Sequence, residues 1–535
     1  MDKIVVRHSS IIINDYNKGD CKKIEDMMSI WDHNYFCMVP IAYYYDEENK
    51  RLYLPRGIDI YYVENLFNTK AKIDYNYDEY KPTNNPIMFK YMPRDDVQKE
   101  SIRFLLGKAE YSAMIRKSQQ SLNLTTGKGK TYCSIATIAC CNIKSAIITY
   151  SISWIEQWKK CFMEYTDLKS RSIKIINSSA TIDTFLSNPN KADQYDIFLF
   201  THNTLKSYGD NKGWYKISEL FKILGIGMKF YDEAHLNFSN MCKIDFFTNT
   251  YKTYYVSASP ARSNEDENRI FKLYFKNVPG IELFDEENDP HTNYICFRYD
   301  SRPTPNQKSR CKNKYGLSIS GYSDYVVTQP NFLKMIDIVL DMCFNVKGKC
   351  LIYMATNKSI LILYNWILKN YPELENDIGI FTSLTDGENK KDNLEKKIIL
   401  STIKSCGTAV DIKGLSLTII AASPFKSEVL MQQVLGRTRD KNTTCIEFID
   451  VAFNQIIKFY YHKRKVIEKY ALENSSIKFS QYELDYRAAN IIEERFMRYN
   501  KVVSIGNYNK LKVVTMREKG FKTKVVSIKR SIDGY

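Results

Sequence analysis

The stretch 122–131, LNLTTGKGKT, connects an apolar run to a segment, TYCSIATIA, that is compatible with a helix. Strand, glycine-rich turn and helix in this order predict a phosphate-binding loop, because glycines let backbone N–H groups turn inward and the helix N-terminus adds partial positive charge. We expect Lys130 to reach the β- and γ-phosphates of a nucleotide and Thr131 to ligate Mg²⁺. Leu124 stands where the usual pattern begins with glycine, so a basic surface turn is the alternative interpretation. The expected nucleotide contacts are Thr126, Gly127, Lys128, Gly129, Lys130 and Thr131.

A second chemical motif follows about one hundred residues later. The stretch 229–235, KFYDEAH, reads as a strand that ends in two adjacent carboxylates and a histidine. Such a strand delivers acids to the carboxyl edge of a parallel sheet, where ligands of open α/β sheets bind. Asp232 can hold Mg²⁺, and Glu233 can orient and deprotonate an attacking water. A solvated helix start is the alternative, but a phosphate loop at domain-scale distance upstream argues against it.

Polar side chains flank the phosphate loop on both sides. Upstream, the amide of Gln98 offers the donor and acceptor that the adenine edge requires, although surface glutamines are common. Downstream, the β-branched run 146–150 has the pattern of a buried strand and leads to Trp154 and Gln157. Polar and aromatic residues at a strand's carboxyl end suit contacts to a nucleic-acid backbone. Trp154 and Trp158 lie one helical turn apart, so the alternative is that both tryptophans belong to the core.

Two further strand patterns end in hydroxyl side chains. The run 196–200 is followed by Thr201 and Thr204, which could hold phosphates of a nucleic acid. The run 254–256 is followed by Ser257 and Ser259, which could relay the state of the nucleotide to the nucleic-acid site. A simple Ser-Pro turn is the alternative for the second pair.

A second α/β series begins near residue 283. We expect strands at 350–354, 398–402 and 417–422 and a helix at 358–366. No phosphate loop occurs in this half, but the segment 430–440 contains Gln433, Arg437 and Arg439. Arginine neutralises phosphate charge with a planar, fixed geometry. Beside a domain that carries loop and acids, these arginines are interpreted as fingers supplied across a cleft; a basic helix face is the alternative.

Composition limits the class of protein. The chain has 535 residues, enough for two or three domains, and 77 Lys+Arg against 61 Asp+Glu give a formal charge of +16. This balance favours a polyanionic partner such as nucleic acid, with general solubility charge as the alternative. Thirteen scattered cysteines without a C-x-x-C pair fit a reducing compartment and no zinc site. We expect no secretory leader and no membrane span, hence a cytoplasmic protein without a membrane partner.

The two ends of the chain show no nucleotide chemistry. Residues 1–90 contain two strand-like runs around the turn 46–50, which predicts a hairpin in a small N-terminal unit. A purely structural unit and a nucleic-acid-binding one are both open. Residues 501–535 are basic with interleaved valines, which predicts a partly β-structured extension that contacts nucleic acid or an acidic partner; a solvated appendage is the alternative.

The motifs in order resemble those of superfamily 2 helicases and translocases. They are LTTGKGKT, WIEQW, THNTL, YDEAH, SASP, STIKSCGTAVD and QQVLGRTR, and they extend over roughly residues 91–470. The leucine-led loop, the upstream LPRG and the segment 453–469 are similar to one group in particular. It is related to the helicase subunit of the eukaryotic transcription-repair factor, and it includes phage branch-migration helicases, transcript-release helicases of poxviruses and other cytoplasmic DNA viruses, and helicases of virus-like yeast cytoplasmic linear plasmids.

The resemblance implies a fold class and four regions. The fold is α/β, with two RecA-like parallel-sheet domains in tandem, a small N-terminal α+β domain and a helical and basic C-terminal extension. The expected regions are 1–90, 91–282, 283–455 and 456–535. ATP and Mg²⁺ would bind between the two RecA-like domains, and nucleic acid would lie across them.

Site roles also follow from the resemblance. His235 with Ser257 and Ser259 would couple the two activities, and Gln98 would contact adenine. The family implies nucleotide contacts at Gly407 and Asp411, nucleic-acid contacts at Trp154, Gln157, Thr201, Thr204, Ser401, Thr402 and Thr408, and catalytic roles for Lys130, Asp232, Glu233, Gln433, Arg437 and Arg439. Two departures stand out, because Ala409 replaces a frequent glycine and Arg439 lies one residue before the usual position of the second arginine.

The sequence therefore predicts an ATP-dependent helicase or translocase that acts on DNA or DNA–RNA hybrids. Its expected setting is transcript release or replication of a cytoplasmic genetic element, with an RNA polymerase or capping machinery as partner. The expected location is the host cytoplasm, or the virion if the element is a virus. The alternatives are an RNA helicase, a translocase that does not unwind, and a scaffold of a transcription complex. The intact Lys130, Asp232, Glu233 and Arg437 argue against the scaffold.

Overall fold

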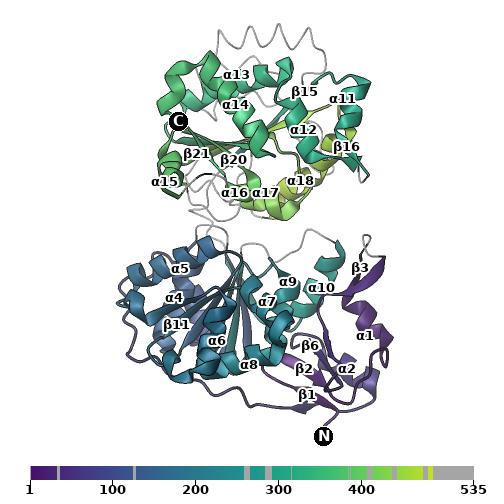
Figure 1. Cartoon of the computed structure of the whole chain (residues 1–535), viewed down its shortest axis with the longest axis vertical. Helices are drawn as coiled ribbons and strands as arrows, with labels where there is room; N and C mark the ends of the chain where they lie inside the picture. Colours follow the sequence, from purple (N-terminus) through teal and green to yellow (C-terminus); the bar gives the residue numbers. More distant parts are fainter. Residues whose placement is uncertain are drawn as a thin grey trace. The chain divides into compact units, whose positions relative to one another are not determined.

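The computed structural model describes residues 2–32, 36–124, 128–257, 265–283, 292–314, 316–382, 385, 387–406, 412–435, 443–473 and 480–485. The chain divides into two compact units, Met1–Phe284 and Asp285–Tyr535 (Figure 1). Each unit contains one seven-stranded sheet in which every pair of strands is parallel. The predicted class, two RecA-like α/β domains in tandem with a small N-terminal mixed sheet, is confirmed.

The N-terminal sheet has five strands in the order β5-β6-β2-β1-β7. Its elements are β1 (Ile4–Val6), β2 (Ser10–Ile13), β5 (Tyr44–Asp46), β6 (Arg51–Pro55), β7 (Lys72–Ile73), α1 (Lys22–Met27) and α2 (Ile60–Phe67), with a separate hairpin of β3 (Ser29–Asp32) and β4 (Cys37–Pro40). The predicted hairpin forms between β5 and β6, where Asp46 lies opposite Arg51. This sheet shares one hydrophobic core with the large sheet of the first unit, so residues 1–90 pack as part of that unit.

The large sheet of the first unit has the strand order β10-β11-β9-β12-β13-β8-β14. Its strands are β8 (Gln119–Leu124), β9 (Ser145–Thr149), β10 (Ile173–Ile176), β11 (Ile197–Thr201), β12 (Met228–Asp232), β13 (Lys252–Ser257) and β14 (Gly280–Leu283). The runs expected as strands at 146–150, 196–200 and 229–232 all lie in it. They form central parallel strands because they are buried on both faces and rich in β-branched and aromatic residues.

Helices cover both faces of this sheet. Alternate strand residues point to opposite faces, so Ile147 and Phe230 pack in one core and Ile148 and Tyr231 in the other. The first core contains α3 (Asp96–Leu106), η1 (Ala109–Arg116), α4 (Lys130–Cys141) and α5 (Ile152–Tyr165). The second contains α6 (Ser179–Ser187), α7 (His202–Lys212), α8 (Trp214–Ile223), α9 (Phe238–Phe247) and α10 (Glu265–Phe275). The short 3₁₀ helices η2 (Ser170–Ser172) and η3 (Pro189–Ala192) lie near β10 in the chain.

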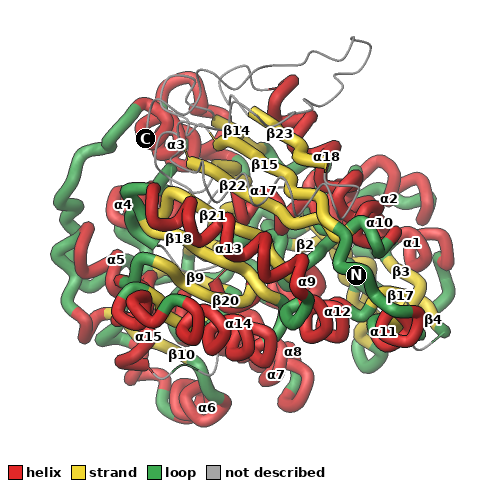
Figure 2. The backbone as a smooth tube through the Cα atoms, turned by 90° about the horizontal axis from the view of Figure 1, so that it is seen from above, coloured by secondary structure: helices red, strands yellow, loops and turns green. Residues whose placement is uncertain are grey.

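The sheet of the second unit has the order β19-β20-β18-β21-β22-β15-β23, and Figure 2 shows β21, β22, β15 and β23 side by side. Its strands are β15 (Thr292–Tyr299), β18 (Lys349–Met354), β19 (Ile378–Phe381), β20 (Ile398–Thr402), β21 (Leu415–Ala422), β22 (Thr443–Asp450) and β23 (Ser480–Asp485), beside a small ladder of β16 (Lys312–Asn313) and β17 (Gly316–Leu317). The helical elements are α11 (Pro305–Arg310), α12 (Ile319–Val326), α13 (Pro330–Asn345), α14 (Asn357–Asn370), η4 (Pro372–Asn376), α15 (Gly387–Glu395), α16 (Ile403–Cys406), α17 (Glu428–Leu435) and α18 (Asn454–Glu473).

One strand of the second sheet comes from the region expected to be a helical extension. After the twenty-residue helix α18, β23 returns to the sheet and pairs in parallel with β15, from Asn293 opposite Ser480 to Arg298 opposite Asp485. None of the helices that the structure describes combines the length and the apolar character of a membrane span.

Candidate nucleotide-binding site

Three neighbouring strands, β12, β13 and β8, bring the sequence motifs together. Because the strands are parallel and adjacent, their carboxyl ends share one edge of the sheet. Strand β8 leads to the glycine-rich turn and α4, strand β12 ends at Asp232, and strand β13 ends at Ser257. The structure therefore brings Lys130, Asp232 and Ser257 to one edge of the sheet.

Gly129 begins the helix that follows the glycine-rich turn. Its φ of +88° lies in the left-handed region, which L side chains rarely adopt. A Cβ at this position would also lie 2.3 Å from the amide nitrogen of Gln98. That nitrogen donates to the Lys128 carbonyl at 3.4 Å, and the Gln98 side-chain oxygen accepts from the Arg94 backbone N–H at 2.9 Å. Gln98 is thus buried against the turn, and both ends of its amide are engaged with backbone.

Lys130 lies in the first turn of α4, and its side chain is largely buried. The ammonium nitrogen donates to the Leu124 carbonyl at 3.3 Å and lies 3.4 Å from a carboxylate oxygen of Glu233. It is therefore held at the carboxyl edge of β8, beside the acid expected to activate water. A phosphate group bound at the helix N-terminus would meet both the ammonium and the dipole of α4.

Asp232 is the last residue of β12. One of its carboxylate oxygens accepts a hydrogen bond of 2.7 Å from the indole N–H of Trp158. Burial, and then the neighbouring Glu233 charge, raise the pKa of Asp232 to about 6. The indole contact orients the carboxylate, so Trp158 is a positioning residue, a role that the sequence did not indicate for it.

The chain turns sharply directly after β12. Glu233 has φ of +50°, an uncommon value for a non-glycine residue. The Ala234 N–H donates to the Val256 carbonyl at 3.1 Å, and the Leu236 N–H donates to the Glu233 carbonyl at 2.7 Å. These two bonds fix the turn and keep the Glu233 side chain beside Lys130. A residue strained in this way at a ligand-binding edge is typical of functional sites.

The turn also brings a histidine to the next strand. His235 is buried, and its Nδ1 lies 2.7 Å from the Ser257 hydroxyl and 3.4 Å from a Glu233 carboxylate oxygen. A movement of the Glu233 carboxylate would therefore alter the contact between His235 and Ser257 at the end of β13. The structure joins the two residues expected to couple nucleotide and nucleic-acid binding, and Ser257 is itself buried.

The donor set at this edge fits Mg²⁺. Mg²⁺ prefers oxygen ligands and is usually held by one or two carboxylates together with substrate phosphates. Asp232 supplies a carboxylate, and Thr131, on the first turn of α4, supplies a hydroxyl. A cation beside the two adjacent acids would offset the charge repulsion that contributes to the raised pKa of Asp232. Within the described ranges, no cluster of three or more His, Cys, Asp or Glu side chains forms a different metal site.

The residues of the first unit that are expected to contact nucleic acid differ in their solvent exposure. Gln157 is exposed on α5, whereas Trp154 on the same helix is buried and packs near Tyr150. The ring of Trp154 therefore belongs to the core, in agreement with the alternative interpretation. Thr201 caps α7 by accepting from the Thr204 N–H at 3.1 Å, and the two hydroxyl oxygens lie 2.8 Å apart. Thr204 is half-buried and Thr201 is buried.

In the second unit, the two hydroxyls at the end of β20 are also engaged. Ser401 is buried and donates to the Phe381 carbonyl at 2.6 Å, so the surface contact expected of it is corrected to a bond inside the sheet. Thr402 is half-buried and accepts from the Ser405 N–H at 3.1 Å. Gln433 lies on α17, but its side chain is outside the described part. Thr126, Gly127, Ser259, Gly407, Thr408, Asp411, Arg437 and Arg439 also lie outside the described residues.

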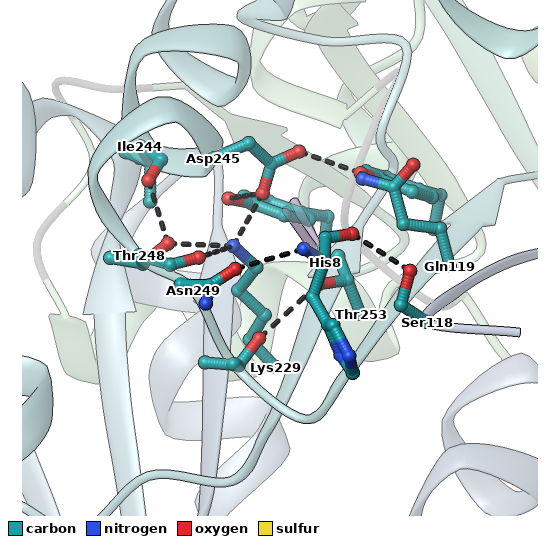
Figure 3. Close-up of polar contacts among 12 residues, drawn as sticks. His8, Ser118, Gln119, Lys229, Ile244, Asp245, Thr248, Asn249 and Thr253 are labelled. Atoms are coloured by element: carbon teal, nitrogen blue, oxygen red, sulfur yellow. Dashed lines mark hydrogen bonds and ion pairs between the residues drawn. The ribbon is translucent and has the colours of Figure 1, made fainter. Parts of the chain in front are cut away.

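Sequence reasoning missed a buried polar network around strand β12. Lys229 and Asp245 are both fully buried and lie 2.6 Å apart, and Lys229 also donates to Thr248 (Figure 3). Asp245 accepts from the hydroxyls of Tyr231 at 2.8 Å, Tyr255 at 2.6 Å and Tyr274. The network links β12, β13, α9 and α10, so it fixes the strand that carries Asp232. A lysine inside an otherwise apolar strand was the only signal in the sequence.

His202 is a second residue that the sequence left unexplained. It begins α7, is fully buried and stacks on Tyr231 with ring centroids 5.6 Å apart. Among the described residues, neither ring nitrogen has a hydrogen-bond partner. Burial lowers the pKa of His202 to about 3, so the imidazole is neutral at physiological pH.

Comparison with known proteins agrees with the motif order. Residues 91–262 match the family described as type III restriction enzyme, res subunit. A comparison with curated proteins found no match. Among solved structures, S. cerevisiae Dbp5 bound to RNA and ADP BeF3 is similar at 15% identity with a TM-score of 0.47, over 76% of this chain and 92% of that one. T4 UvsW is similar at 17% identity with a TM-score of 0.35, over 90% and 100%. At these values, the fold is assigned from the strand order of the chain itself.

Proposed function

We propose that the chain is a superfamily 2 helicase ATPase that uses ATP hydrolysis to move along nucleic acid and to separate strands. The match of residues 91–262 to the res-subunit family supports this proposal. The observation that supports this proposal is the convergence of Lys130, Glu233 and His235 at one sheet edge. The Lys130 ammonium lies 3.4 Å from Glu233, and His235 lies 2.7 Å from Ser257 on the next strand.

Different residues of the chain serve different parts of ATP hydrolysis. The α4 N-terminus and Lys130 bind the phosphates, and Glu233 orients the attacking water and takes its proton. Thr131 and Asp232 would hold Mg²⁺, which neutralises charge on the phosphates when bound. Trp158 keeps the Asp232 carboxylate in place through the 2.7 Å indole bond. We assign the arginine fingers to Arg437 and, secondarily, Arg439, because arginine matches the transferring phosphoryl group.

We propose that His235 couples ATP hydrolysis to movement along the nucleic acid. Its imidazole touches both the Glu233 carboxylate and the Ser257 hydroxyl. When phosphates draw Lys130 away from Glu233, the acid can change its contact with His235 and so alter the end of β13. We propose that this relay, together with Gln157 and the hydroxyl-bearing strand ends, links the nucleotide to a bound nucleic-acid strand.

We assign the activity to transcript release or replication of a cytoplasmic genetic element. Support comes from the resemblance of the leucine-led loop, the LPRG segment and the tail 453–469 to helicases of that kind. The formal charge of +16 favours a nucleic-acid partner, and an RNA polymerase or capping machinery is the protein partner that this role requires. Release of RNA from a stalled elongation complex, with and without ATP, tests the assignment; release independent of ATP contradicts it.

The ATPase assignment itself is tested by two variants. Glu233→Gln keeps the phosphate cradle, which consists of the glycine-rich turn, Lys130 and the N-terminus of α4, but removes the base. We therefore expect ATP binding to persist while turnover falls at least a hundredfold. Lys130→Ala removes a phosphate ligand, so ATP binding itself should weaken. Turnover and nucleotide affinity are measured with and without DNA or RNA, and an ATP-dependent strand-displacement assay separates a helicase from a translocase that does not unwind.

Two outcomes would contradict the division of roles. Wild-type turnover in Lys130→Ala would contradict the assignment of Lys130 as a phosphate ligand. Loss of ATP binding in Glu233→Gln would show that Glu233 is not merely the base. A wild-type chain without nucleic-acid-stimulated hydrolysis would favour the scaffold.

A further inference from the structure

A cavity lies where strand β8 begins, at the edge of the first large sheet opposite to the candidate nucleotide-binding site. It has a volume of about 460 Å³ and is lined by Arg56, Ile58, Asp59, Ile60, Tyr61, Arg116, Lys117, Ser118, Gln119, Asn277 and Pro279. Its walls come from the β6–α2 connection, from the segment between η1 and β8, and from the α10–β14 turn. We call it the junction cavity, because the N-terminal sheet and the ATPase sheet both contribute to it.

The junction cavity is separate from the nucleotide cradle. Gln119 begins β8 and Leu124 ends it, and the carbonyl of Leu124 contacts Lys130. Five residue steps at roughly 3.3 Å each place the two ends about 17 Å apart. A ligand in the junction cavity therefore cannot be the ATP bound by the glycine-rich turn.

The charge of the lining favours an anion. Arg56, Arg116 and Lys117 line the cavity, and Asp59 is the single acid among the described lining residues. Asp59 is already engaged, since it accepts from the Tyr61 N–H at 3.1 Å and lies 3.4 Å from the Lys276 ammonium. Arg56 is half-buried, and within the described chain its guanidinium has no hydrogen bond or ion pair. Burial lowers the pKa of Arg56, which shows that its charge is poorly solvated.

The cations are held in place before any ligand binds. Lys252 donates to the carbonyls of Met114, Ile115 and Lys117 at 2.9, 2.8 and 2.5 Å, which pins the segment that carries Arg116. On the other wall, Gly57 follows Arg56, and a Cβ there would lie 1.9 Å from the Tyr274 carbonyl oxygen. The close approach that glycine permits holds the backbone next to Arg56 against the end of α10.

The β6–α2 wall and the α10–β14 wall are bonded to each other, since the Asn277 N–H donates to the Gly57 carbonyl at 3.2 Å. Ser118 donates to the His8 carbonyl at 2.8 Å, and the His8 N–H donates to Asn249 at 3.0 Å (Figure 3). These bonds join the β1–β2 turn to the ATPase sheet. The cavity is therefore a fixed feature of the first unit, and binding there does not first require the walls to close.

The rest of the lining suits a nucleotide better than a bare phosphate. Tyr61 is 70% exposed, and together with Ile58, Ile60 and Pro279 it forms an apolar side on which a base can stack. The side-chain oxygen of Gln119 is buried without a partner in the described chain. Its amide nitrogen donates to the Tyr255 hydroxyl at 2.8 Å, and that hydroxyl donates to Asp245, which fixes the amide orientation.

We propose that the junction cavity is a second nucleotide-binding site, with the phosphate on Arg56, Arg116 and Lys117 and the base against Tyr61. The ligand is a nucleotide unit, supplied either as a free nucleotide or as part of a nucleic-acid strand. The site does not depend on the proposed function, because its residues are distinct from those of the cradle.

The test uses the full chain with Lys130→Ala, which weakens the cradle, and AMP, which lacks the β- and γ-phosphates that Lys130 reaches. Phenylglyoxal modifies accessible arginines, and mass spectrometry locates the modified residues. We expect AMP to protect Arg56 and Arg116 and to leave Arg171, an exposed arginine on η2, unprotected. This readout needs no substitution in the cavity, so a folding defect cannot obscure it.

Variants provide the matched comparison. The pair Arg56→Gln and Arg116→Gln should weaken AMP binding at least tenfold by calorimetry, since each charge-assisted hydrogen bond to phosphate is strong. Arg171→Gln removes one positive charge outside the cavity and should leave the affinity unchanged. If Arg171→Gln has the same effect as the cavity variants, attraction is non-specific and the proposal is wrong.

A twelve-nucleotide single-stranded DNA identifies the source of the ligand. Protection by AMP indicates a free nucleotide, and protection by the DNA alone indicates a nucleotide within a strand; both outcomes support the site. If neither probe protects Arg56 and Arg116, the junction cavity is not a nucleotide site. Hydrolysis by the cradle is measured separately, so failure of one assignment is distinguishable from failure of the other.

Discussion

A side chain at position 129 would meet two obstacles at once. The backbone φ of +88° disfavours any L residue, and an added Cβ would lie 2.3 Å from the Gln98 amide nitrogen. The turn and the glutamine therefore fit each other only when residue 129 is glycine. This places Gln98 among the residues that shape the cradle, in addition to the adenine contact expected from the sequence.

We predict that Gly129→Ala weakens ATP binding at least tenfold, because the turn must move to relieve the clash. Adding Gln98→Ala removes the clash but leaves the left-handed backbone, which costs about 1–2 kcal/mol. The double variant should therefore recover only part of the affinity, since the left-handed backbone remains and Gln98→Ala also removes the expected adenine contact; a fluorescent ATP analogue measures the recovery. Equal affinity of Gly129→Ala and wild type would show that the cradle tolerates a different turn.

His202 predicts a dependence of stability on pH. Its pKa is about 3 in the folded chain and 6.5 when exposed, so the unfolded chain takes up a proton first as the pH falls. The contribution is complete above pH 6.5 and is lost progressively between pH 6.5 and pH 3, by about 3 kcal/mol at pH 4. Urea unfolding of wild type and His202→Phe, compared from pH 7 to pH 4, isolates this loss because phenylalanine keeps a ring beside Tyr231 but cannot titrate. Parallel pH profiles would contradict the assignment.

At the scale of the element, β12 depends on the Lys229–Asp245 pair. Removing one partner leaves a buried charge without compensation, which costs about 3–5 kcal/mol. We predict a loss of this size in the unfolding free energy for Asp245→Asn. The double variant Lys229→Met with Asp245→Asn should be more stable than the sum of the two single losses, as a double-mutant cycle measures. Additive losses would mean that the two side chains do not depend on each other.

Some elements could be predicted from the sequence because their signal is local. The strands 145–149, 197–201 and 398–402 are mostly apolar runs with β-branched and aromatic residues, and the motifs located Lys130 after β8 and Asp232 at the end of β12. The pair Lys229–Asp245 could not be predicted, since it requires the orientation of α9 against β12. Ser401 shows the converse: its hydroxyl was expected to face nucleic acid, but it bonds the neighbouring strand. Sequence patterns indicate which residues end strands, whereas partners across elements come from the fold.

At the scale of the whole molecule, β23 is an edge strand of the second sheet. It pairs along β15, whose other side pairs with β22. Without β23 the edge passes to β15, which has eight residues and one charge, whereas β23 has six residues and two acids. Long edges with few charges recruit another chain more readily than short charged ones. We predict that a chain shortened to residues 1–478 self-associates, whereas a chain shortened to 1–500, which retains β23, does not. Sedimentation velocity measures the difference, and equal behaviour of the two chains would contradict it.

The position of β23 also sets an order for folding during synthesis. The first unit is complete at Phe284, but the second sheet needs β23, which ends at Asp485. About 200 residues separate these two points, and a ribosome takes on the order of 10–40 s to add them. The residues of the proposed ATP site are therefore synthesised, and can fold, before β15 has its partner strand. A chaperone that acts on this protein would be needed most during that interval, and on the second unit.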